Sequence, residues 1–127
     1  MYFRFNTKTA IDLNGFTLKS NDAENYIHFT AESENSELTI KDSSADVLGK
    51  LSISSISCDA GRLNINSGTF KCNSIGSILR EGGITSITGG RFIIDPDDSL
   101  FFSHDALDSY TPLGYESVKV DTTDYEC

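Results

Sequence analysis

The sequence predicts an all-β solenoid, and three patterns support this fold class. Apolar and polar residues alternate in short segments, as in Leu63 and Ile65, and a period of two is typical of half-buried strands. Clusters of Ser, Asn, Asp and Gly separate these segments, as expected for tight turns. The segment ITSITGGRFIID at 84–95 also repeats the pattern of GRLNINSGTFKC at 61–72. Repetition of a short strand–turn–strand unit favours stacked coils over a single sandwich or barrel.

The two copies belong to a longer repeat that also contains LTIKDSSA at 38–45 and IDLNGFTL at 11–18. Equivalent positions lie 27, 25 and 22 residues apart, a period typical of solenoids in which each coil buries its face against its neighbours. The period is too short for a propeller blade, and the Leu and Asn consensus of leucine-rich repeats is missing. We therefore predict a right-handed parallel β-helix of about five short coils, with capping segments at both ends.

The alignment predicts ladders of equivalent residues that run from coil to coil. The ladders are Ile11, Leu38, Leu63 and Thr85; Leu13, Ile40, Ile65 and Ile87; the turn residues Gly15, Asp42, Ser67 and Gly89; and Leu18, Ala45, Phe70 and Phe92. In this register Asp12 stacks over Thr39, Asn64 and Ser86. The outer face of these strands would then carry a single carboxylate.

A third strand in each coil is expected from closely spaced apolar residues. These are Ile27 with Phe29, Ile53 with Ile56, Ile75 with Ile78, and Leu100 with Phe102. We expect one domain over 1–127, with coils at 11–102, an N-terminal cap at 1–10 and a C-terminal cap and tail at 103–127. Caps are needed because each end of a solenoid is a row of unpaired strand edges. Ends left uncovered would favour end-to-end self-association.

Composition limits the classes of partner. The formal net charge of −9 over 127 residues argues against binding to nucleic acid, whose phosphates would be repelled. A neutral glycan, a cationic partner and calcium are compatible with it. No signal peptide is visible at the N-terminus, and no apolar run approaches the roughly 20 residues that span a bilayer, so membrane insertion is not expected.

The three cysteines, Cys58, Cys72 and Cys127, predict no metal site. Their odd number leaves at least one free thiol if a pair forms. The spacing between Cys58 and Cys72 matches neither a zinc motif nor a CxxC redox motif, and the redox state of the three thiols stays open.

The order of the repeated phrases resembles a known group of proteins. IDLNGFTL, ELTIKDSS and ITGGRF are similar to the LDLNGxTL, LTIxDSS and ISGGxF phrases of parallel β-helix modules in large surface proteins of gut Firmicutes. RFIIDPDD at 91–98, followed by LGYESVKV at 113–120, repeats the order in which such modules end. The resemblance covers residue 11 to about 120. It implies a secreted or cell-surface parent and a structural or adhesive role, and it transfers no catalytic residues.

An enzyme is the alternative, because many parallel β-helices cleave polysaccharides. Lyases of this fold combine calcium-binding acids with an Arg or Lys base, for which Arg62, Arg80 and Arg91 are the candidates. Arg91 is in register with Thr69, whereas Arg62 precedes a different strand, so the two need not share a face. Glycoside hydrolysis needs a pair of carboxylates, and the predicted register offers Asp12 alone. We therefore expect no catalysis.

The densest acidic cluster is DPDD, with Asp95, Asp97 and Asp98. Alternating carboxylates suit calcium, which takes six to eight oxygen ligands, but the Gly and closing Glu of an EF-hand are missing. Asp-Pro is also a common turn opener, so a solvated turn is the competing interpretation. His28 and His104 are expected at the surface.

The segment SLFFSHDALDSYTPLGY is rich in aromatic residues and non-repetitive. Tyr110, Tyr115, Phe101 and Phe102 are the candidate binding residues, because aromatic side chains give a large contact area. At least one Phe is expected to seal the core instead. The leading hypothesis is a non-catalytic module that binds a glycan or a host or cell-surface protein. A trimeric phage tail-fibre or spike segment is a further alternative.

Overall fold

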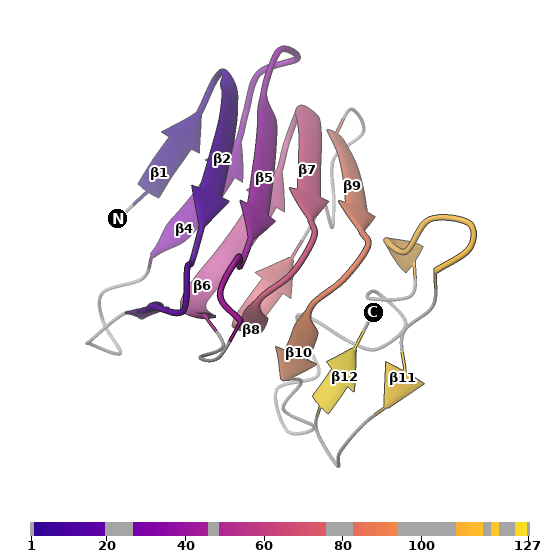
Figure 1. The fold of residues 1–127 in the computed structure, drawn as a ribbon. Helices are drawn as coiled ribbons and strands as arrows, with labels where there is room; N and C mark the ends of the chain where they lie inside the picture. The colour runs from indigo at the N-terminus through magenta and orange to yellow at the C-terminus, as the bar shows by residue number, and fades with distance from the viewer. Residues whose placement is uncertain are drawn as a thin grey trace.

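The structure is a computed structural model, and its strands stack into a parallel β-helix (Figure 1). It describes residues 2–19, 27–45, 49–75, 83–93, 109–115, 118–119 and 124–126. The described strands are β1 (Tyr2–Phe5), β2 (Lys8–Asp12), β3 (Thr17–Lys19), β4 (His28–Ala31), β5 (Glu37–Lys41), β6 (Lys50–Cys58), β7 (Gly61–Ile65), β8 (Thr69–Ile75), β9 (Gly83–Ile87), β10 (Arg91–Ile93), β11 (Val118–Lys119) and β12 (Asp124–Glu126).

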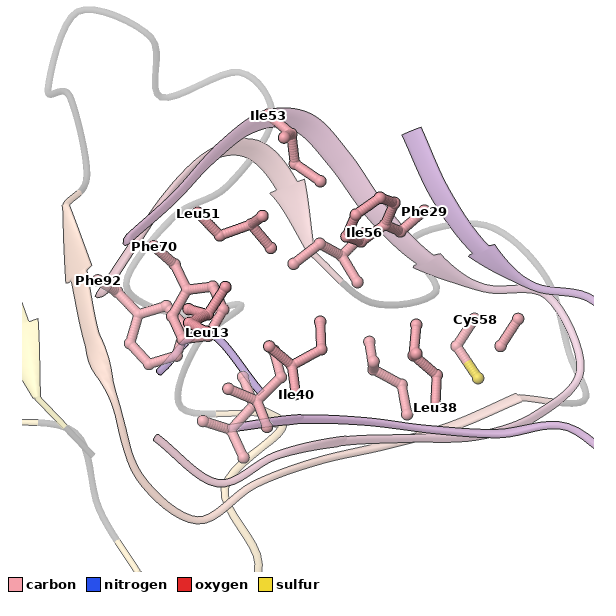
Figure 2. Close-up of a cluster of buried hydrophobic side chains, with 14 residues drawn as sticks. Leu13, Phe29, Leu38, Ile40, Leu51, Ile53, Ile56, Cys58, Phe70 and Phe92 are labelled. Carbon is pink, nitrogen blue, oxygen red and sulfur yellow. The ribbon is translucent and has the colours of Figure 1, made fainter. Parts of the chain in front are cut away.

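Each coil contributes strands to three parallel faces. The first face is the sheet β2-β5-β7-β9. The second sheet, β1-β4-β6-β8-β10, forms the other two faces, because β6 pairs with β3 through its first half and with β4 through its second half. The pairing of β6 with β8 skips Ser54, and β6 bends there beside Ile53 (Figure 2). The predicted fold class is therefore confirmed, and so is the third strand at Phe29 and at Ile56. The other residues predicted for this strand, Ile78, Leu100 and Phe102, lie outside the described residues.

Two of the predicted ladders, those of the first strand in each coil, are correct from the second coil onward. Ile40, Ile65 and Ile87 lie opposite one another, and so do Leu38 and Leu63 with Thr85. Thr85 ends its ladder with a buried hydroxyl that has no hydrogen-bond partner among the described residues.

The first coil was predicted two residues out of register. Ile11 lies opposite Ile40, not Leu38. The cause is Leu13, which turns into the core at the corner and donates its N–H to the Lys41 carbonyl over 2.8 Å. The turn at Gly15 therefore comes two residues later than the turns of the following coils. A shift of two leaves every side chain on its original face, which is why alternation alone did not reveal it.

Two further assignments in the predicted register were wrong. Leu51, not Ala45, connects Leu18 to Phe70 and Phe92, because the chain between β5 and β6 is longer than the turn between β7 and β8. Phe70 and Phe92 stack with ring centroids 5.1 Å apart. In addition, Asp12 lies opposite Lys41, and it is Ala10 that lies opposite Thr39.

The core is a stack of inward-facing residues from all three faces (Figure 2). The third face contributes Phe29, Ile56 and Ala31, and Ile75 lies in register with Ile56. Cys58 adds a buried free thiol, and burial raises the pKa of this thiol. No Cβ atom fits at Gly61, where φ is 79° and the carbonyl oxygen of Ser36 passes directly against the backbone.

The two ends of the solenoid are built differently. At the N-terminal end, β1 runs parallel to β4, so the segment expected to be a cap contains β1 and most of β2, both in solenoid register. At the C-terminal end, β12 pairs antiparallel with β10 and with β11, which stops the parallel ladder on that face.

Candidate binding face

The outward side of the sheet β2-β5-β7-β9, here called the outer face, carries rows of polar side chains. One row contains Lys8, Glu37, Arg62 and Ile84; the next contains Ala10, Thr39, Asn64 and Ser86; a third begins with Asp12 and Lys41. The rows follow from the period of two, because the residues that lie between them on β5 and β7 are buried in the core. Asp12 and Glu37 share this face, so the expectation of a single carboxylate was wrong.

Hydrogen bonds and ion pairs connect neighbouring coils across the outer face. The Asn64 amide donates to Glu37 Oε1 over 3.2 Å and to Thr39 Oγ1 over 3.3 Å. Lys8 Nζ lies 3.9 Å from Glu37 Oε2. Exposed contacts of this kind add little stability.

A shallow hollow of about 490 Å³ lies at the amino ends of β5, β7 and β9. Its lining residues are Glu34, Asn35, Ser36, Glu37, Gly61, Arg62 and Ile84. The wall of the hollow is the turn between β4 and β5, where Ser36 is 3% exposed. The Ser36 hydroxyl donates to the Phe5 carbonyl over 2.7 Å, and it accepts from the Ser33 N–H. The hollow therefore has a fixed wall.

The hollow combines charged, amide and apolar groups. Arg62 is exposed and forms no ion pair with a described residue, so its N–H donors are available. Glu34 and Asn35 are exposed on the turn. Ile84 is 55% exposed, although it stands at a position where alternation calls for a polar residue. Sequence patterns identified Arg62 but not Glu34, Asn35 or Ile84. The signal that could have indicated this site is Ile84, an apolar residue at a position where the alternation expects a polar one.

Other polar groups on the described residues have structural roles. Asp12 Oδ1 accepts hydrogen bonds from Asn14 N–H and Ser43 N–H, each with a donor–acceptor distance of 3.0 Å. The hydrogen bonds with Ser43 lower the pKa of Asp12. His28 Nδ1 on β4 lies 2.6 Å from Ser55 Oγ on β6, and partial burial lowers the pKa of this imidazole. His28 is thus half-buried beside a neighbouring coil.

The candidate binding tyrosines occupy different environments. Tyr110 is half-buried and packs against the core, its carbonyl accepts from Ile87 N–H over 2.9 Å, and burial raises the pKa of its phenol. Tyr115 is 50% exposed. The remaining candidates, Phe101, Phe102, Asp95, Asp97 and Asp98, lie outside the described residues, as do Arg80, His104 and Cys127.

The described part of the chain contains no group of three or more His, Cys, Asp or Glu side chains that could hold a metal ion. Its helical residues include no segment long and apolar enough to cross a membrane. Arg91 lies opposite Thr69, as predicted, on β10 and β8, whereas Arg62 lies on β7. The two basic residues therefore belong to different sheets.

Comparison with known proteins found no matching family model, no matching curated protein and no matching solved structure. The geometry of the outer face and its hollow is therefore the basis for a functional interpretation.

Proposed function

We propose that the chain is a non-catalytic β-helix module that binds a glycan on its outer face, with the hollow beside Arg62 as the centre of the site. We place it in a bacterial secreted or cell-surface protein, because its phrases resemble the modules of gut Firmicutes surface proteins. A rigid solenoid suits such a role, since it presents a long face on a framework that hardly changes shape.

The observation that carries this proposal is the mixture of groups in the hollow. A sugar ring presents hydroxyl groups around its edge and C–H groups on its faces. Arg62 supplies donors for hydroxyl oxygens, Glu34 supplies acceptors, and the exposed side chain of Ile84 gives a surface for the C–H groups. Because the hollow is shallow and open, it suits one unit of an extended chain that continues across the polar rows.

Binding to an array of neutral and acidic oligosaccharides, followed by calorimetry with the best ligand, tests this proposal. We expect Arg62→Ala and Ile84→Ser each to weaken binding by roughly tenfold or more, as for loss of a central contact. Lys71→Ala is the matched control, because Lys71 is an exposed cation on β8, away from the outer face. Equal affinities for all four proteins would refute the proposed site.

The same ligands distinguish a binding module from an enzyme. We expect no new reducing ends and no unsaturated products after long incubation of the chain with polysaccharides, with and without calcium. Turnover would instead favour the carbohydrate-active alternative. Loss of that turnover in Arg62→Ala would then assign Arg62 to catalysis.

A further inference from the structure

We infer that the N-terminal end of the solenoid is a self-association surface, on which two copies of the chain pair head to head through antiparallel β2 strands. Three edge strands meet at this end, one for each face. These are β1, β2 and β3, each of which has a parallel partner on one side in the described ladders. Such edges are templates for pairing with another chain.

Apolar side chains of the described residues are exposed at the same end. Phe3 stacks edge-on over Phe29 with ring centroids 5.5 Å apart, yet it remains 44% exposed. Leu18 begins the ladder that continues through Leu51, and it remains 41% exposed. The neighbouring Phe16 is 74% exposed. These three side chains leave apolar surface exposed at this end, and exposed apolar surface is a feature of interaction sites.

The backbone of β2 is oriented for pairing at its outer edge. The Thr7 carbonyl accepts from Glu37 N–H, and Leu13 N–H donates to the Lys41 carbonyl, so the odd-numbered residues of this segment direct their backbone groups towards β5. In a parallel ladder the intervening residues direct theirs the other way. The N–H and C=O groups of Lys8, Ala10 and Asp12 therefore point away from β5, in the plane of the sheet and towards its edge.

The charges on β2 are self-complementary. An antiparallel pair centred on Ala10 sets Ala10 opposite Ala10 of the second copy, and it sets each Lys8 opposite an Asp12. Along the outer face the sign already alternates from coil to coil, from Lys8 to Glu37 to Arg62 in one row and from Asp12 to Lys41 in another. Head-to-head pairing continues this alternation through the two-fold axis.

Head-to-tail stacking lacks these features. At the C-terminal end β12 already pairs with β10, and the Tyr110 carbonyl already accepts from Ile87 N–H at the end of β9. The last strand of the outer face, with sequence GITSI, also carries no charge that would complement Lys8 and Asp12. The N-terminal end of a second copy is therefore the favoured occupant.

Sedimentation velocity over a concentration series tests the pairing, with charges introduced on the two-fold axis. Ala10 is exposed, so Ala10→Glu and Ala10→Lys disturb no buried contact of the protomer. We expect the wild type to dimerise and each variant to dimerise roughly tenfold more weakly, because like charges then lie directly opposite. A one-to-one mixture of the two variants should recover the dimer, since Glu then faces Lys.

Ser86→Glu is the matched control, because Ser86 occupies the same row at the opposite end of the solenoid and should leave the dimer unchanged. Circular dichroism of each variant verifies that the protomer is folded. A monomeric wild type would overturn the inference and leave this end to another occupant. Three other outcomes would also overturn it. Both Ala10 variants could dimerise as tightly as the wild type, their one-to-one mixture could fail to form the dimer, or Ser86→Glu could weaken the dimer.

Discussion

Asp42 shows how one carboxylate can join coils that are far apart in sequence. Its Oδ1 accepts from the Gly15 N–H over 3.0 Å and from the Ser44 hydroxyl over 2.7 Å, and its Oδ2 accepts from the Gly49 N–H over 2.6 Å. The Asp42 N–H in turn donates to Ser67 Oγ over 2.7 Å. One residue therefore connects the corners of three successive coils.

We expect replacement of Asp42 by Asn to lower the stability of the fold at neutral pH and to flatten its dependence on acid. The hydrogen bond from the Ser44 hydroxyl and those from backbone N–H groups lower the pKa of Asp42 from 3.8 to about 2. Because the pKa is lower in the folded state, the ionised Asp42 stabilises the fold at any pH above 3.8, the pKa in the unfolded chain. This contribution is lost as the pH falls from 3.8 towards about 2.

Urea unfolding of the wild type and of Asp42→Asn at neutral pH and along an acid series measures both effects. At neutral pH we expect a loss of about 1 to 2 kcal/mol, because an amide provides fewer acceptor sites for the N–H and O–H donors that converge here. Glu34→Gln is the control, since Glu34 is exposed on a turn. Parallel acid profiles for the wild type and Asp42→Asn would contradict the assignment.

At the scale of the strands, a side chain gains its burial from the coils above and below it. Ile65 lies between Ile40 and Ile87 and is fully buried. Ile11 faces the same core from the first strand of the sheet, but it is only half-buried because it has a neighbour on one side alone. The side chains of a ladder are therefore most buried in the middle coils and least buried in the first coil.

This gradient predicts unequal costs for the same substitution. Ile65→Val should lower the free energy of unfolding by about 1 kcal/mol, since it removes one methylene from a closely packed site. Ile11→Val should cost less than half of that, because part of its side chain already faces solvent. Chemical denaturation of the two variants provides the comparison. Equal losses would mean that the first coil is packed as tightly as the third.

At the scale of the whole molecule, stability depends on how the last coil is covered. Tyr110 lies 17 residues beyond Ile93, the last residue of β10, and yet it packs against the core of the coils. Its backbone also accepts a hydrogen bond from β9. The covering of the C-terminal end therefore relies on a segment outside the repeat.

A comparison of two tyrosines separates covering from binding. Tyr110→Ala should cost about 2 kcal/mol of stability, because it exposes part of the core, whereas Tyr115→Ala should change stability by less than about 0.5 kcal/mol. Thermal and urea unfolding measure the difference. If both variants unfold like the wild type, Tyr110 does not protect the core.

The sequence by itself determined the class of fold and the face on which most described side chains lie. Both depend on local alternation and on a repeat of nearly constant length, which are visible in residues such as Leu63 and Ile65. The ladders of the later coils followed as well, since short turns such as Asn66-Ser67-Gly68 leave little freedom in register.

The tertiary structure alone decided the register of the first coil, the bend of β6 and the hollow beside Arg62. Leu13 shifts its coil by two residues through a contact with β5, and this shift is invisible to a period of two. The hollow likewise combines a turn, Arg62 and Ile84 from three successive coils. Such features arise where coils of unequal length meet, and that meeting depends on contacts between residues distant in sequence, which local patterns do not encode.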